Sequence, residues 1–455
     1  MCALLLAAFS SRSMGDLAIW ISEGQQIFLQ KTIYIKEMYS INVTTQYPYP
    51  WLSSVIYFGI YQLLGIDFIF YFHRFIPFFI LLFWIREYPQ LLYKKNWWIL
   101  VLALIGSSSI FIDRPALLAL PLVTLAFHFF EKNYIRKKSM YLYILLFFWV
   151  QLHGSFVLYF IFFGWKFATN ILVRKKAFLI KTYTKFFAQS LLITLLNPWG
   201  IKIYEYVYAT ATVSSYRMTE WEALKISGNN KEISIFAGFF VFATLLLLLK
   251  RKVSSRLILK NSTPLFIMMI FGVRNVSLFF ITWPLAYFQR RQSIIQANQS
   301  IPLTKKIINN ILLTFLAIVS LFLMTSQSVP IRQKLKSNSF QFYDETSVPM
   351  IFSYLQSQPG KKIIFNDWAV GSHMTLLPDV KIFIDTRNII YSDQIVLDYE
   401  NIYFRQYSQS KDKIEELRIN YILIKDSELL AQSLQTSPDW RRIMSEGLYV
   451  LYQKN

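Results

Sequence analysis

Long apolar runs separated by short polar turns constrain the fold of this chain more than any other feature. They recur between residues 66 and 324: Ile66–Ile85, Trp97–Ile112, Ala116–Phe130, Tyr141–Leu152, Phe156–Val173, Ile233–Leu249, Thr263–Gly272, Val276–Phe288 and Ile307–Met324. With 55% hydrophobic and only 16% charged residues, the composition is typical of a polytopic membrane protein. A helix needs about 20 residues to cross the hydrocarbon core. We therefore expect an α-helical membrane bundle of about 11–13 helices, in which the shorter runs are tilted or buried.

The formal net charge of +21 could indicate a nucleic-acid partner, but the distribution of the charge argues against one. Basic residues concentrate in short loops: Lys132, Arg136, Lys137 and Lys138; Arg174, Lys175, Lys176, Lys181 and Lys185; Lys250, Arg251, Lys252, Arg256 and Lys260; Arg290, Arg291, Lys305 and Lys306. The positive-inside rule places these loops in the cytoplasm. Alternation then places a second set of polar residues on the outer side. This set is Asp16, Arg114, His153, Asn197, Glu220 and Arg274.

A change in composition near residue 328 divides the chain into two predicted domains. Residues 1–328 form the membrane domain, and residues 329–455 form a small α/β domain that topology parity places outside the cytoplasm. The predicted strands of this tail are Lys362–Phe365, Lys381–Ile384, Tyr421–Ile424 and Tyr449–Tyr452, and its predicted helices are Val348–Gln356, Ser392–Tyr407 and Ser427–Leu434. Near residues 16–30, apolar residues at helical spacing, with Ser22, Glu23 and Gln25 opposite, predict a helix lying in the membrane interface.

The outer polar residues are the first candidates for a functional site, because ionisable groups near a bilayer are costly and usually face water or a cavity. Asp16 can deprotonate an acceptor or hold a divalent metal such as Mg or Mn, or it can be the N-cap of the predicted helix. Arg114 and Arg274 can clamp a lipid phosphate, or they can extend to the headgroups. Glu220 is a further candidate to line the same cavity.

The remaining candidates have structural alternatives. His153 can bind a donor phosphate or sugar, although a lone histidine at a helix end is more often structural. Asn197, in Asn197-Pro198-Trp199-Gly200, is a further candidate to bind the donor phosphate or sugar, although the motif suits a helix terminator. In the tail, Asp367 and the pair Asp385 and Arg387 follow strand ends, where α/β sheets bind ligands, and a structural Asp–Arg pair is the simpler interpretation. Cys2 is the only cysteine, which excludes an internal disulfide and a cysteine metal cluster.

Short motifs follow one another along nearly the whole chain. They are Gly15-Asp16-Leu17 with Gly24, Trp51-Leu52-Ser53, Arg114-Pro115, Trp149-Val150-Gln151-Leu152-His153-Gly154, Leu196-Asn197-Pro198-Trp199-Gly200, Glu220-Trp221, Arg274-Asn275, Phe365-Asn366-Asp367, Gly371 and Phe383-Ile384-Asp385-Thr386-Arg387. Their order resembles that of a family of bacterial polytopic proteins grouped with the GT-C glycosyltransferases. That group includes protein O-mannosyltransferases, aminoarabinose transferases and oligosaccharyltransferase catalytic subunits.

The resemblance implies a polyprenyl-phosphate-linked sugar donor, with Asp16 as base or metal ligand. It also implies transfer on the outer side of the membrane. The chain departs from the family in two places. The family has a His shortly after its first Asp and a His-Glu pair before the Trp-Leu, where this chain has Trp20-Ile21 and Tyr49-Pro50. If the missing acid holds a metal in the family, this chain is metal-independent or inactive.

We therefore expect a multi-pass glycosyltransferase of the inner (cytoplasmic) membrane, with the lipid bilayer, the lipid-linked donor and an envelope glycan, lipid or protein acceptor as its partners. Arg114 and Arg274 would clamp the donor phosphate and His153 would contact the donor. A transporter or flippase of a lipid-linked glycan is the main alternative, but it predicts ionisable residues in mid-span and two related halves. A catalytically inactive membrane scaffold that displays the tail is the third alternative.

Overall fold

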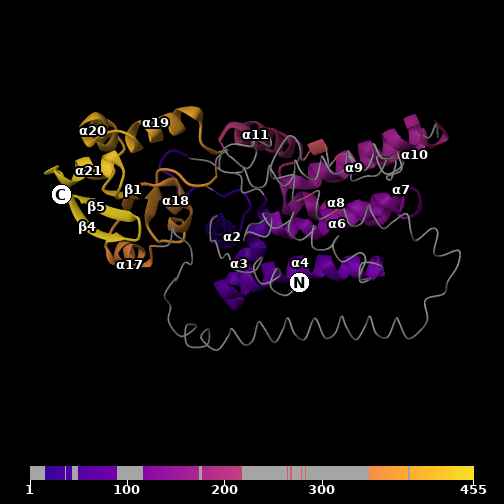
Figure 1. The fold of residues 1–455 in the computed structure, drawn as a ribbon, viewed down its shortest axis with the longest axis horizontal. Helices are drawn as coiled ribbons and strands as arrows, with labels where there is room; N and C mark the ends of the chain where they lie inside the picture. Colours follow the sequence, from indigo (N-terminus) through magenta and orange to yellow (C-terminus); the bar gives the residue numbers. More distant parts are fainter. Residues whose placement is uncertain are drawn as a thin grey trace, which may run out of the picture.

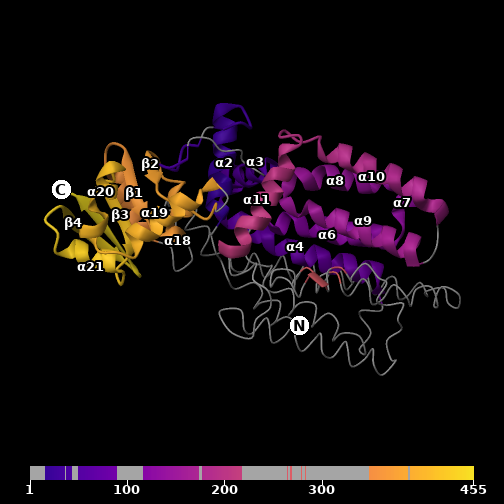
Figure 2. The ribbon, with the colours of Figure 1, turned by 90° about the horizontal axis from the view of Figure 1, so that it is seen from above.

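The computed structural model describes residues 16–35, 37–43, 50–89, 116–173, 177–217, 348–387 and 390–455, and the single residues 264, 267, 268, 278 and 282. A helical part and a sheet-bearing tail are seen in both views, with α2 and α3 lying between them (Figures 1 and 2). The predicted domain boundary at residues 328 and 329 lies outside the described residues, as do most residues of the predicted spans beyond residue 217. The division into two domains therefore stays a prediction.

The described ranges of the helical part contain short and medium helices. They are α2 (Leu17–Gln30), α3 (Trp51–Leu64), α4 (Ile66–Glu87), α6 (Ala116–Glu131), α7 (Tyr134–Lys137), α8 (Ser139–Leu152), α9 (Val157–Ala168), α10 (Ile180–Thr194) and α11 (Lys202–Arg217). Gly65, with φ of 81°, ends α3 and precedes α4, a conformation that favours glycine. Within the described ranges, none of the helices combines the length and the apolar character needed to cross a membrane.

Aromatic side chains fill the core of the helical part. Phe127 and Phe130 of α6 pack against Phe162 and Tyr159 of α9, with ring centroids 5.7 Å apart for Phe127–Phe162 and 5.0 Å apart for Phe130–Tyr159. All four residues are fully buried. Edge-to-face pairs of this kind add to the stabilisation that burial of apolar area provides. The predicted apolar runs at residues 66–85, 116–130 and 141–152 are thus confirmed as helices, and their membrane placement stays a prediction.

The tail is a mixed sheet flanked by helices. Its elements are α17 (Pro349–Ser357), β1 (Lys362–Asn366), α18 (Trp368–Met374), β2 (Val380–Ile382), α19 (Asp393–Tyr403), α20 (Tyr407–Glu416), β3 (Tyr421–Lys425), α21 (Leu429–Gln435), β4 (Trp440–Glu446) and β5 (Tyr449–Lys454). The strand order is β2-β1-β3-β5-β4, in which β2, β1 and β3 are parallel and β5 and β4 are antiparallel to their neighbours. The predicted strands at residues 362–365, 421–424 and 449–452 are confirmed, whereas β2 covers residues 380–382 and not the predicted 381–384. Elements α18, α20 and β4 were not predicted.

The two faces of the sheet are covered by different parts of the chain. Alternation along β1 sends Phe365 toward α19, α20 and α21, and Ile364 toward α17 and α18. The hydrophobic cluster around Ile364 also contains Leu17, Ala18 and Ile21 of α2. Helix α2 therefore shares a hydrophobic core with the tail, and Figure 2 shows it beside α18.

The segment after α2 extends the sheet beyond β2. The amide of Ile382 donates to the carbonyl of Tyr39 at 2.7 Å, and the amide of Ile41 donates to the carbonyl of Ile382 at 3.0 Å. Ser40 and Ile382 form a parallel bridge. An exposed edge strand presents unpaired backbone groups, so residues 39–41 cover an edge that would otherwise be open.

Candidate functional site

Asp16 lies at the N-terminal end of α2. It occupies the N-cap position, which was one of the two predicted roles for this residue. Its side chain makes no capping hydrogen bond, however. The following residues Leu17 and Ala18 are fully buried, whereas Asp16 is partly exposed. The backbone at this helix start is thus fixed in the core, and the carboxylate is not used to cap the helix.

Tyr206 of α11 lies near two carboxylates of α2. Burial raises the pKa of its phenol, and so do the negative charges of Glu23 and Asp16. A nearby negative charge disfavours the phenolate, so burial and these two charges act in the same direction. The Tyr206 hydroxyl therefore remains protonated at neutral pH and can donate a hydrogen bond there.

Glu23 lies where α2 and α3 approach closely. Its Oε2 accepts a hydrogen bond from the Ser54 hydroxyl of α3 at 3.3 Å, and the residue is 1% exposed. The adjacent Gly24 makes the approach possible, because a Cβ at this position would lie 2.1 Å from the Ser54 carbonyl oxygen. Ser22, Glu23 and Gln25 were predicted to form one polar helix face, but Ser22 and Glu23 are buried and only Gln25 is exposed.

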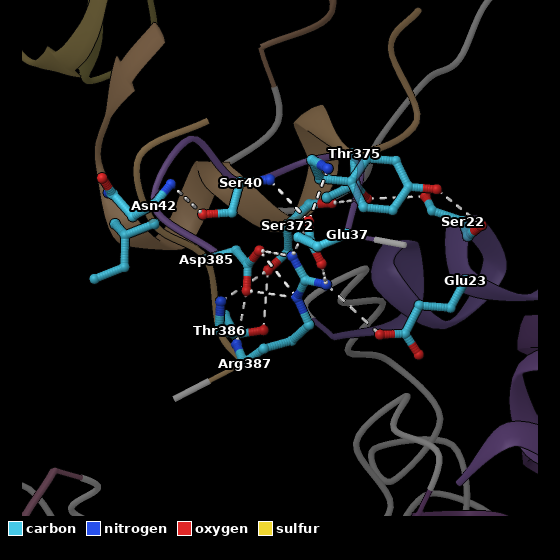
Figure 3. Close-up of polar contacts among 12 residues, drawn as sticks. Ser22, Glu23, Glu37, Ser40, Asn42, Ser372, Thr375, Asp385, Thr386 and Arg387 are labelled. Carbon is cyan, nitrogen blue, oxygen red and sulfur yellow. Dashed lines mark hydrogen bonds and ion pairs between the residues drawn. The ribbon is translucent and has the colours of Figure 1, made fainter. Parts of the chain in front are cut away.

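Arg387 connects the tail to the segment around α2 (Figure 3). Its Nη2 donates to Asp385 Oδ2 at 2.6 Å, its Nη1 donates to Glu37 Oε2 at 2.8 Å, and Nη1 lies 3.7 Å from Glu23 Oε1. The Arg387 side chain is 9% exposed and the three carboxylates are 0–2% exposed. Burial lowers the pKa of Arg387, but Asp385 and Glu37 outweigh this effect and raise it well above its usual value. The predicted structural pair Asp385–Arg387 is confirmed, with two further partners.

Glu37 also fixes the loop after α2. Its Oε1 accepts hydrogen bonds from the amides of Tyr39 at 2.7 Å and Ser40 at 2.8 Å. The Tyr39 hydroxyl donates to the Ser22 carbonyl at 2.9 Å, and the Ser22 hydroxyl lies 2.9 Å from that of Thr375 at the end of α18. Buried charged and polar groups are therefore satisfied across this junction.

Motif residues from distant parts of the sequence meet at one end of the helical part. The Trp51 indole donates to the Gln151 amide oxygen at 2.9 Å, and Gln151 in turn donates to the Leu196 carbonyl at 2.9 Å. Ser53 donates to the Leu152 carbonyl at 2.6 Å. Because Ser54 of the same helix bonds Glu23, this network connects the α3, α8 and residue 196–200 motifs to α2.

His153 and Asn197 have structural roles in this network. His153 Nδ1 accepts from the Ser155 amide at 3.1 Å and so caps the 3₁₀ turn Gly154–Phe156 between α8 and α9. The Asn197 amide donates to the Thr194 carbonyl at 2.5 Å, and its oxygen accepts from the Trp199 amide at 2.8 Å. The predicted helix terminator is therefore confirmed for Asn197, while the donor-binding roles stay predictions.

Asp367 is a buried N-cap in the tail. Its Oδ1 accepts from the Ala369 amide at 2.9 Å at the start of α18, and its Oδ2 accepts from the Tyr403 hydroxyl at 2.5 Å. The side chain, which follows the last residue of β1, thus connects α18 to α19. These contacts indicate a structural role for Asp367 in the position where the sequence predicted ligand binding.

Arg114, Glu220 and Arg274 lie outside the described residues, so their roles stay predictions. The divalent metal also stays a prediction. In the ranges that the structure describes, no group of three or more His, Cys, Asp or Glu side chains is arranged to hold a metal ion.

Three residues of this region were not named as site candidates from the sequence: Glu23, Glu37 and Tyr206. Glu23 carried a sequence signal, because a charged residue seven positions after Asp16 lies on the same helix face. Glu37 and Tyr206 carried none, because their partners come from distant segments.

No family model and no curated protein matches the chain. Among solved structures, the chain is similar to the archaeal oligosaccharyltransferase AglB from Archaeoglobus fulgidus, determined in complex with an inhibitory peptide and a dolichol-phosphate. The two share 11% sequence identity with a TM-score of 0.28, over 81% of this chain and 54% of that chain. The chain thus spans about half the length of this archaeal structure.

Proposed function

We propose that the protein is a GT-C-type glycosyltransferase of the inner (cytoplasmic) membrane. It moves a sugar from a polyprenyl-phosphate-linked donor to an envelope glycan, lipid or protein acceptor on the outer side, where the tail also lies. The observation that carries the proposal is the position of Asp16, a partly exposed residue at the start of α2 whose side chain is not used for capping. The gathering of the family-like motifs at one end of the helical part supports it.

In this mechanism Asp16 is the general base. It accepts the proton of the acceptor hydroxyl while the acceptor oxygen bonds to the anomeric carbon and the bond from that carbon to the phosphate oxygen breaks. The electron pair of the broken bond leaves with the polyprenyl phosphate, and attack from the opposite face inverts the anomeric configuration. The sequence assigns stabilisation of the leaving phosphate to Arg114 and Arg274, and contact with the donor to His153.

Transfer from a panel of labelled polyprenyl-phosphate sugars in proteoliposomes tests the proposal. We expect Asp16→Asn to lower the transfer rate by about 10²- to 10⁴-fold, which is the usual contribution of a general base. Asp412→Asn, on the exposed face of α20, is the matched control and should transfer at the wild-type rate. Each variant is measured with and without Mg²⁺ or Mn²⁺. Undiminished transfer by a folded Asp16→Asn variant would remove Asp16 from the mechanism. No transfer by the wild type from any donor would favour the transporter or the scaffold.

A further inference from the structure

Arg387 brings a charge of the tail to the helix that carries Asp16. Its own strand end supplies Asp385, whereas Glu37 and Glu23 come from the N-terminal part of the chain, 350 positions away in the case of Glu37. Figure 3 shows the guanidinium between Asp385, Glu37 and Glu23. The planar guanidinium holds carboxylates in a fixed orientation, which a lysine ammonium does not.

Glu23 connects this cluster to the proposed base. It lies seven residues after Asp16 on α2, which is about two helical turns and about 10 Å along the axis. Positions seven residues apart lie on the same face of an α-helix, so both carboxylates belong to one face of α2. A restraint on Glu23 therefore fixes the rotation of α2 about its axis, and with it the direction of the Asp16 side chain.

Burial makes this restraint strict. With its side chain 2% exposed, Glu23 cannot exchange its protein partners for water without moving α2. Loss of one partner of a buried charge leaves the other uncompensated, so the helix must shift or the charge must be neutralised. A shift of about 1 Å in a catalytic group can cost about 100-fold in rate.

We propose that Arg387 is a positioning residue through which the tail aligns α2, and hence Asp16, for sugar transfer. The inference rests on the proposed function and extends the site into the tail. It makes the tail a working part of the transferase, because the guanidinium that sets the rotation of the catalytic helix comes from there.

Steady-state transfer by Arg387→Lys and Glu23→Gln in the full-length chain tests this role. Arg387→Lys keeps the positive charge but loses the planar guanidinium. Glu23→Gln keeps the shape of the side chain but loses its charge, while Glu37 and Asp385 still bind Arg387. We expect each variant to lower kcat by about 10- to 100-fold with KM for the donor within about threefold of wild type. The double variant should be no slower than the slower single variant, since both changes break one linkage.

Arg442→Lys is the matched control. Arg442 lies in the same tail and forms an ion pair with Asp426 at 2.9 Å, but the two side chains are 44% and 41% exposed. The kcat of the Arg442→Lys variant should therefore equal that of the wild type. A lower melting temperature with unchanged kcat in folded Arg387→Lys and Glu23→Gln would overturn the inference, because Arg387 would then only stabilise the fold. Loss of transfer in Asp16→Asn in the same experiment would show that the proposed function survives that result. No transfer by the wild type would overturn both.

Discussion

At the scale of single residues, two glycines set how closely neighbouring elements approach. A Cβ on Gly24 would lie 2.1 Å from the Ser54 carbonyl oxygen, and a Cβ on Gly371 would lie 2.1 Å from the Ile384 carbonyl oxygen. The first contact joins α2 to α3 beside Glu23, and the second joins α18 to the chain just before Asp385. Both glycines therefore stand next to residues of the Arg387 cluster.

Substitution of these glycines should separate the elements. We expect Gly24→Ala to lower the free energy of unfolding by about 1–3 kcal/mol or more, because the methyl group meets backbone atoms that cannot rotate away. Gly59→Ala in α3, where a Cβ would have nothing within 4 Å, is the control and should not destabilise the protein. The melting temperatures of the two variants in detergent provide the comparison, and equal values would contradict the close approach seen here.

The sequence identified part of this residue-scale arrangement. Gly24, Gly371 and the Asp385–Arg387 pair all stood in the short motifs that carry the family resemblance, because such motifs are local in the sequence. Glu37 did not, since its partner lies 350 positions away and no local pattern records such a pair. The pairing of distant charges is a property of the folded chain, and one sequence does not contain it.

At the scale of elements, the pairing of residues 39–41 with β2 is the contact that completes the sheet. Ile41→Pro removes the amide that donates to the Ile382 carbonyl, whereas Ile41→Ala retains it. We expect the amide of Ile382, which donates to Tyr39, to exchange with solvent about 3- to 10-fold faster in the proline variant, as loss of one hydrogen bond predicts. Equal protection in both variants, measured by hydrogen–deuterium exchange, would show that the segment does not cover the edge.

The elements also differ in how far the sequence predicts them. Strands β1, β2, β3 and β5 were found because apolar residues dominate them. The edge strand β4 carries Arg441 and Arg442 and was missed, since charges on an edge strand disguise it while they protect it from other chains. The predicted helix Ser392–Tyr407 proved to be two elements, α19 and the start of α20.

At the scale of the whole molecule, buried tyrosines should make stability sensitive to alkaline pH. Burial, followed by the nearby Asp367, raises the pKa of Tyr399 and of Tyr403, and burial also raises that of Tyr39. Above pH of about 10 the unfolded chain releases these protons while the folded chain retains them, so the stability present below that pH falls as the pH rises. The loss should reach about 1.4 kcal/mol per pH unit for each such tyrosine.

Tyr399→Phe should reduce the fall in the free energy of unfolding per pH unit by the contribution of one phenol. Tyr208→Phe, at an exposed position of α11, is its control. Chemical denaturation of the full-length chain between pH 8 and pH about 11 measures the slope. A slope that is the same in wild type and Tyr399→Phe would show that this phenol ionises equally in both states.

The two segments that pair at the sheet edge are also synthesised at different times. Asn42 and its partner Phe383 are 341 positions apart in the chain, and a ribosome that adds about 5–20 residues per second needs about 20–70 s to make the intervening length. Throughout that interval Glu23 and Glu37 exist without the guanidinium that later neutralises them, and α2 exists without the tail core that buries it. Helix α2 therefore reaches its final place only when the last quarter of the chain has been made.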